Sequence, residues 1–152
     1  MKMDSKKRAL DKLYKRRDRY EIPEWQREEV WGDKKKQQLI DSILRGWKLP
    51  KFYFLRTSDE RDEFEVVDGQ QRLSTIFEFF GNELPLAQDS AEEFGGKFYK
   101  ELHEKYSDEF DDFEIEYDEI GEADDKEVKE FFQRLQQGLP LTGERETQLH
   151  SQ

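Results

Sequence analysis

The sequence predicts a mixed α+β fold, in which helices surround a small mixed sheet. Stretches with helical apolar spacing are interspersed with short strand-like runs, and no Pro/Gly/Ser-rich linker divides the 152 residues. This length is typical of one domain. The 12 Phe, 6 Tyr and 3 Trp can fill a core although 41% of the residues are charged. We therefore expect one continuous domain with a helical segment in front of it.

The first half of the chain is divided as follows. Residues 1–19 are predicted to be a basic helical arm, capped by Asp4 or Ser5 and running to about Arg17. The domain itself is expected to span residues 20–152. A helix starting at Asp33 places its apolar residues on one face and ends near Gly46. Strands at 51–56 and 64–67 are joined by a charged turn, which predicts a hairpin.

The second half begins with a helix that follows Asp68-Gly69 and ends at Gly81, with apolar residues at i, i+3, i+4 and i+7. One helix is expected around Phe98, Leu102 and Tyr106, after a break at Gly95-Gly96. Residues 113–118 alternate with period two, as in a half-buried or edge strand. A helix from Asp124 or Asp125 to Gly138 and a last short helix from Thr142 complete the order.

Composition excludes several kinds of chemistry. The chain has no Cys and only two His, at His103 and His150, so it offers no disulfide framework, thiolate nucleophile or His-rich zinc site. No apolar run approaches the roughly 18 residues of a membrane span. The basic N-terminus lacks the apolar stretch of a signal peptide. A soluble, cytoplasmic protein without a membrane partner is expected.

Charge is distributed unevenly along the chain. Residues 1–20 hold nine Lys or Arg against three Asp, a net charge of +6, so the remaining residues carry −17 of the total of −11. A basic segment of this kind can contact a polyanion. It can instead dock on its own acidic body or remain solvated, and these are the commoner outcomes for a run of charges.

The residues EVVDGQQRLST, at 65–75, carry the clearest functional signal. A strand ends at Asp68, Gly69 permits a tight turn, and a helix begins with Gln70, Gln71 and Arg72. Free N–H groups and the helix dipole favour phosphate at such a position, arginine can bond two phosphate oxygens, and a carboxylate can hold Mg²⁺. The alternative is an ordinary Asp-Gly turn followed by an exposed first turn.

Two further segments contain polar residues between aromatic or apolar ones. In YEIPEWQREEVW, Gln26 and Arg27 lie between tryptophans, which form either a packed hinge or a stacking platform for a base. In EFFQRLQQGLPL, the Phe and Leu positions are core by their spacing. Arg134 and Gln136 lie on other faces of that helix, toward solvent or a ligand.

Together these segments resemble the N-terminal domain of GmrSD-type restriction endonucleases, a family marked by a DGQQR box and also seen in SspE-like defence proteins. The matching positions, in order, are Ile22, Gln26-Arg27, Trp31, 39–44, Leu49-Pro50, 66–75 and 132–141. The resemblance covers about residues 20–141. It implies a ParB/sulfiredoxin-like fold in which a strand-to-helix turn cradles nucleotide phosphates, and whose members use nucleoside triphosphates to govern DNA cleavage by a separate nuclease module.

The resemblance therefore implies a nucleoside triphosphate-binding domain of a restriction or anti-phage defence system. Asp68, Gln70, Gln71 and Arg72 would act on the phosphates, with Asp68 holding Mg²⁺. Gly69, Gln26, Arg27, Arg134 and Gln136 would complete the nucleotide site. Hydrolysis is left open, and DNA would be reached through a partner nuclease or a longer assembly.

The chain departs from the family pattern at two places. Gln136 replaces a usual Asn, and Arg145 replaces a usual Glu. It contains no His-Asn-His cluster, so no nuclease activity is expected from this chain alone. Two other functions remain open: a nucleic-acid-binding module that uses the basic arm, and a non-catalytic regulatory or interaction protein.

Overall fold

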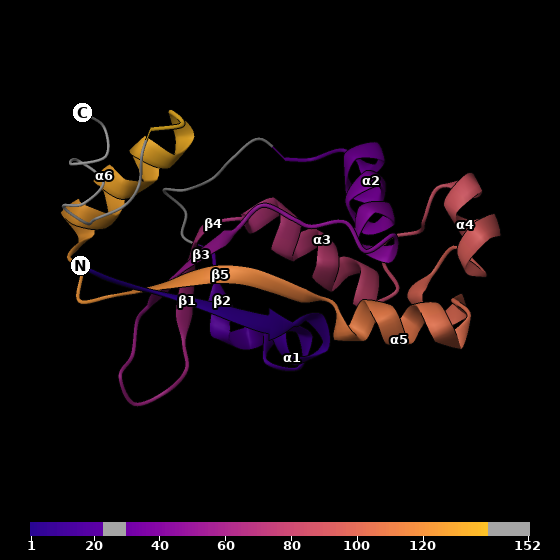
Figure 1. The fold of residues 1–152 in the computed structure, drawn as a ribbon, viewed down its shortest axis with the longest axis horizontal. Helices are drawn as coiled ribbons and strands as arrows, with labels where there is room; N and C mark the ends of the chain where they lie inside the picture. Colours follow the sequence, from indigo (N-terminus) through magenta and orange to yellow (C-terminus); the bar gives the residue numbers. More distant parts are fainter. Residues whose placement is uncertain (23–29, 140–152) are drawn as a thin grey trace.

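The computed structural model of the chain describes residues 1–22 and 30–139. The strands are β1 (Lys2–Ala9), β2 (Tyr20–Glu21), β3 (Phe52–Arg56), β4 (Phe64–Asp68) and β5 (Glu114–Gly121). The helices are α1 (Leu10–Lys15), α2 (Asp33–Leu44), α3 (Gln70–Phe80), α4 (Gln88–Phe94), α5 (Glu104–Asp112) and α6 (Asp125–Gln136), with short 3₁₀ turns at Arg17–Arg19 and Tyr99–Glu101. The predicted mixed α+β class is confirmed (Figure 1).

The five strands form one mixed sheet in the order β1-β5-β3-β4-β2. β3 and β4 are antiparallel neighbours, which confirms the predicted hairpin. β5 runs parallel to β3 and antiparallel to β1, and β2 runs parallel to β4. The strand predicted at 113–118 is longer than expected, and it is not an edge strand because β1 covers its outer side.

The sheet separates two cores, because neighbouring residues of a strand point to opposite faces. Phe54 and Val66 belong to the larger core, into which α1, α2, α3 and α5 insert their apolar residues. Leu55 and Val67 face the smaller core, which α6 covers. Figure 1 shows α6 apart from the other helices, at the left of the view.

The predicted N-terminal helix is wrong over its first half. Residues 2–9 form β1, an edge strand paired with β5 over its whole length, and only Leu10–Lys15 is helical. Ser5 donates a hydrogen bond to Asp118 at 2.8 Å and Lys6 donates one to Glu119 at 3.0 Å. An isolated helix of this length is marginal, whereas an acidic strand offers basic residues both backbone partners and opposite charges.

Residues 83–112 also differ from the prediction. Two helices, α4 and α5, replace the single one, and Leu102 lies between them in extended backbone. Gly95 adopts a φ of 116°, and a Cβ there would collide with His103, so the chain reverses at this glycine. Leu102 and Tyr106, which share a helical spacing in the sequence, therefore reach the core from separate segments.

The other predicted helices are confirmed. α2 begins at Asp33, α3 begins after Gly69, and Asp124 caps α6 through a reciprocal capping box with Glu127. The short helix predicted from Thr142 lies outside the described residues. No helix in the described parts of the chain is long and apolar enough to cross a bilayer.

Candidate functional site

The turn between β4 and α3 depends on Gly69. Its φ of 101° lies in the left-handed region, and a side chain at this position would collide with the ring of Phe52 on β3. The turn lets α3 begin directly after Gly69, which as the N-cap residue supplies no side-chain cap to the first N–H groups. The strand–turn–helix expected from the sequence is therefore present.

Gln70 stabilises this turn from inside. Its side chain is only 2% exposed, and its amide nitrogen donates to the carbonyls of Val66 at 3.3 Å and Val67 at 3.1 Å. These carbonyls belong to the residues of β4 that directly precede Asp68. Gln70 thus ties the start of α3 to the strand that precedes it.

Arg72 connects α3 to the start of β3. Its guanidinium lies 4.1 Å from the centre of the Phe52 ring and donates hydrogen bonds to the carbonyls of Pro50 and Lys51. Nη2 is also 3.4 Å from Oδ2 of Asp68, and the side chain is 12% exposed. Arg72 is therefore engaged by the protein itself, which gives it a positioning role, and its phosphate role stays a prediction.

Asp68 ends β4 with a partly buried carboxyl. Burial raises the pKa of Asp68, and this effect outweighs Arg72 and the Gly69 N–H, which both lower it. The charged carboxylate is consequently less stable here than on the surface. A cation brought to this position would favour its ionised form.

Gln71 is only partly buried, unlike Gln70. Its Oε1 accepts the backbone N–H of Trp31 at 3.2 Å, and no acceptor for its NH₂ group is seen among the described residues. Its backbone carbonyl accepts Thr75 Oγ1 at 2.7 Å. Of the predicted catalytic set, Gln71 is thus the side chain best placed to donate to a ligand.

The segment that carries Gln26 and Arg27 lies outside the described residues, but both of its flanks contact this region. Before it, β2 pairs Tyr20 with Phe64 and Glu21 with Glu65, on β4. After it, Trp31 reaches Gln71 on α3. The second sequence motif is therefore anchored to the first at both ends by contacts that the sequence did not reveal.

The third motif lies on α6, on the other face of the sheet. Phe131 and Phe132 are buried in the smaller core, as their spacing predicted. Arg134 is half exposed and pairs with Glu130 at 3.2 Å, and Gln136 ends the helix. The ion pair of Arg134 lies within α6 and does not join it to the β4–α3 turn, so the role of Arg134 and Gln136 in the site stays a prediction.

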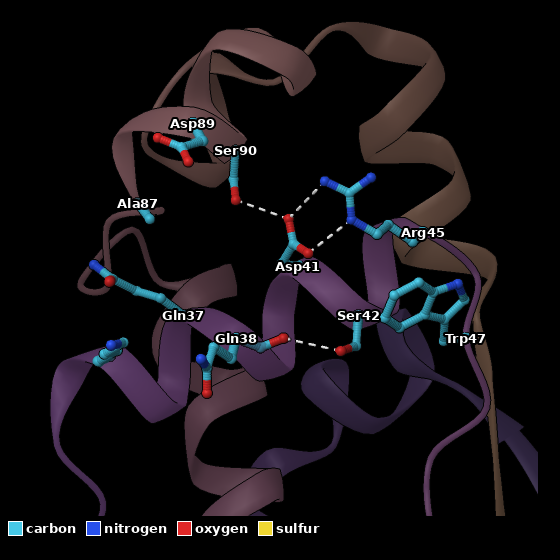
Figure 2. A pocket seen from close by; sticks show the side chains of 10 residues that line it. Gln37, Gln38, Asp41, Ser42, Arg45, Trp47, Ala87, Asp89 and Ser90 are labelled. Carbon is cyan, nitrogen blue, oxygen red and sulfur yellow. Dashed lines mark hydrogen bonds and ion pairs between the residues drawn. The ribbon is translucent and has the colours of Figure 1, made fainter.

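A separate pocket of about 580 Å³ lies between α2 and α4 (Figure 2). Asp41 accepts hydrogen bonds there from Arg45 and from Ser90, at 2.7 and 2.8 Å. Trp47 lines the pocket and is 61% exposed. Sequence reasoning did not find it, because these residues meet only when α2 packs beside α4.

Comparisons with known proteins bear on the same residues. Residues 10–149 match the family described as GmrSD restriction endonuclease, N-terminal domain. The chain belongs to this family. The resemblance drawn from the DGQQR box and its companion motifs is thereby confirmed, and the GmrSD N-terminal domain match covers all three motifs.

The GmrSD-type chain was also compared with curated protein sequences and with solved structures. No curated protein sequence matched it. One similar structure is the C-terminally truncated chromosome-partitioning protein ParB from Caulobacter crescentus, complexed with CTP-gamma-S, with a TM-score of 0.48 and 12% sequence identity. The similarity covers 90% of this chain but 54% of the ParB chain, so this chain spans about half the length of that protein.

Proposed function

We propose that this chain binds a nucleoside triphosphate at the β4–α3 turn, as a domain of a DNA restriction or anti-phage defence system. The observation that carries the proposal is the left-handed Gly69, which places the uncapped first turn of α3 directly after the carboxylate of Asp68. Membership of the GmrSD N-terminal domain family supports the assignment to a restriction or defence system. The turn thus combines helix N-terminal N–H groups, which can bind phosphate, with a carboxylate that can hold a cation beside it.

The residues divide into two roles. Gln71 and the N–H groups of the first helical turn would donate to phosphate oxygens, joined by Gln26 and Arg27 from the neighbouring segment. Gln70, Arg72 and Phe52 hold the turn in shape. Because Arg72 already contacts two backbone carbonyls, its contribution to the ligand is through position as well as charge.

Mg²⁺ fits this site as a companion of the nucleotide. No group of three His, Asp or Glu side chains able to hold a metal occurs in the described parts of the chain. Mg²⁺ commonly takes one or two carboxylates and completes its shell with phosphate oxygens and water, and Asp68 would supply that carboxylate. The ion would neutralise phosphate charge beside the helix N-terminus.

The proposal states that the chain binds a nucleoside triphosphate. Hydrolysis of the bound nucleotide is measured separately, in the same samples. Phosphoryl transfer depends on positioning a water and on stabilising charge, which requires more groups than binding does. Phosphate release above the rate of the Asp68→Asn variant would assign an NTPase. Release equal to that variant would leave a nucleotide-binding domain.

Isothermal titration of the full chain with each common nucleoside triphosphate and Mg²⁺ tests the site. Asp68→Asn should weaken Mg²⁺-dependent binding about tenfold or more, as expected for losing one charged contact. Asp108→Asn, an exposed carboxylate on α5, is the matched control and should bind like the unchanged chain. Absence of binding to the unchanged chain, or equal affinities for both variants, would remove the site.

A further inference from the structure

The pocket of about 580 Å³ between α2 and α4 is crossed by a closed network of polar side chains (Figure 2). Arg45 pairs with Asp41 at 2.7 Å and with Glu93 at 2.8 Å. Ser90 donates its hydroxyl to the same Asp41 at 2.8 Å. Each charge of this network has a partner inside the protein, so the network holds α4 beside α2 and gives the pocket a fixed shape.

Trp47 lines the pocket and is held in place by the end of α2. The helix ends at Leu44, Gly46 adopts a φ of 78°, and the N–H of Trp47 donates to the carbonyl of Ser42 at 3.0 Å. In this Schellman arrangement the residue after the glycine commonly packs on an apolar residue of the last helical turn. At the positions concerned α2 has Ser42 and Asp41, and the indole is 61% exposed.

Other polar groups around the pocket are not engaged by the described part of the chain. Lys34, Gln38 and Asp89 line the pocket and are exposed, and no hydrogen bond or ion pair of their side chains occurs within residues 1–22 and 30–139. The carboxamide of Gln38 can both donate and accept. Together with Arg45 and Asp41, these residues give the lining two charges of each sign. The pocket therefore offers donors and acceptors without a net charge.

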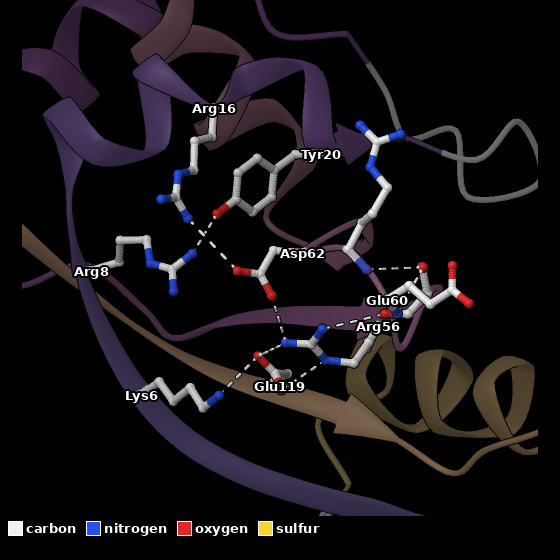
Figure 3. Close-up of polar contacts among 10 residues, drawn as sticks. Lys6, Arg8, Arg16, Tyr20, Arg56, Glu60, Asp62 and Glu119 are labelled. Carbon is white, nitrogen blue, oxygen red and sulfur yellow. Dashed lines mark hydrogen bonds and ion pairs between the residues drawn. The ribbon is translucent and has the colours of Figure 1, made fainter.

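Figure 3 shows a polar cluster of a different kind, on β1, β3 and β5 and the segments beside them. Glu119 pairs there with Lys6 at 3.0 Å and with Arg56 at 3.2 Å. Asp62 pairs with Arg56 at 3.2 Å and with Arg16 at 3.7 Å. Both carboxylates are shared between two cations of the protein, so this cluster joins segments of the fold. The pocket between α2 and α4 differs from it in its exposed indole and its unengaged polar groups.

A polypeptide segment matches the chemistry of this lining. A lining with balanced charges does not concentrate polyanions or polycations. An extended backbone presents N–H donors and C=O acceptors in alternation, and a carboxamide such as that of Gln38 can bond to both. An exposed indole offers a large apolar surface for a side chain of the partner, and tryptophan is enriched among the residues that carry the binding energy of protein contacts.

The length of the lining indicates the length of the segment. Lys34 and Arg45 lie at the two ends of its helical part, which spans roughly 16 Å at about 1.5 Å per residue. An extended chain covers that distance with about five residues, at about 3.3 Å each.

We propose that the pocket between α2 and α4 binds an extended segment of a partner protein, about five residues long, with little net charge and with an aromatic or large aliphatic side chain packed on Trp47. The lining contains none of the residues assigned to the nucleotide. The inference therefore goes beyond nucleotide binding and does not rest on it. It gives the exposed indole the apolar contact that the last turn of α2 does not provide.

Phage display of random peptides of about seven residues on the full chain, slightly longer than the pocket, tests the proposal. The enriched sequences should share an aromatic or large aliphatic residue. Labelled copies of these peptides are then titrated by fluorescence anisotropy. Trp47→Ser should weaken their binding at least about tenfold, because a few aromatic anchors carry most of the energy of such contacts.

Leu139→Ser is the matched control, since it also removes an exposed apolar side chain but lies just after α6, outside the pocket. It should bind the peptides as the unchanged chain does. In NMR spectra of nitrogen-labelled protein, the indole N–H signal of Trp47, identified by its absence in Trp47→Phe, should shift as peptide is added. An indole signal that stays in place while the peptide binds would contradict the proposal.

Three other results would overturn the proposal: no enriched peptide binds the unchanged chain, the enriched peptides lack an apolar residue, or Trp47→Ser and Leu139→Ser bind equally well. Displacement of the peptide by a nucleoside triphosphate with Mg²⁺ would also overturn it and assign the pocket to the nucleotide. Thermal unfolding first checks that each variant is folded. If Trp47→Ser is not, Gln38→Arg, at an exposed position of α2, places a bulky charge in the pocket and should weaken binding about tenfold.

Discussion

Gly69 shows how a single residue determines the geometry of the candidate site. The glycine lies against Phe52, and the guanidinium of Arg72 covers the same ring at 4.1 Å. Backbone conformation, aromatic packing and a cation–π contact therefore depend on one another at this turn. The DGQQR sequence is therefore a packing unit, besides the ligand contacts proposed for it.

Gly69→Ala should lower the free energy of unfolding by about 2 kcal/mol or more, because the left-handed backbone and the Phe52 ring both oppose a side chain. Gly121→Ala is the matched control, since a Cβ there meets no atom within 4 Å. Chemical denaturation monitored by circular dichroism measures both variants. Equal losses for the two would contradict the assigned role of Gly69.

At the scale of elements, β1 changes how the N-terminus is understood. The segment looked like a separable basic arm, yet it pairs with β5 from Lys2 to Ala9. It also converts β5 from an edge strand into an internal one. The basic residues of this segment therefore stabilise the sheet, in addition to any partner that they bind.

Deleting residues 1–9 should destabilise the domain by roughly 2 kcal/mol or more and expose the edge of β5, which favours self-association. Light scattering and thermal unfolding measure these effects. Lys2→Gln/Lys6→Gln, which keeps the strand and removes two of its charges, should remain monodisperse with a smaller loss of stability. Unchanged stability on deletion would mean that the segment is an arm after all.

At the scale of the whole molecule, partly buried carboxylates pair with cations, some of which come from distant segments. Burial would raise the pKa of Glu119, but hydrogen bonds from Arg56 and Lys6 outweigh it and hold that pKa below its ordinary value. For Asp41, Arg45 and Ser90 likewise overcome burial and lower the pKa. Both carboxylates are therefore more readily ionised in the folded chain than in the unfolded one.

Acidification should consequently destabilise the protein. A carboxylate with a depressed folded pKa contributes stability above its unfolded value, near 4, and loses that contribution as pH falls through the folded pKa. Thermal unfolding should therefore show a lower midpoint at pH 3 than at pH 6. Glu119→Gln/Asp41→Asn should flatten this dependence, whereas Glu104→Gln/Asp108→Asn, on the exposed face of α5, should leave it unchanged.

The sequence by itself determined the fold class, the β3–β4 hairpin and the helices that begin at Asp33, Gln70 and Asp125. These features follow from local signals, namely apolar spacing, turn residues and caps, which act within a few residues. The DGQQR box and its two companion motifs were sufficient to indicate the family. Interactions within a few residues and one distinctive set of motifs were therefore sufficient to predict these elements and the family.

Only the tertiary structure decided the rest. β1 is a strand because β5 supplies its partner about 113 residues away, as the Ser5–Asp118 contact shows. Arg72 faces backbone carbonyls of Pro50 and Lys51, and Lys7, Lys12 and Lys15 line one pocket where β1 passes into α1. Such arrangements depend on contacts between remote segments, and local propensity contains no information about them.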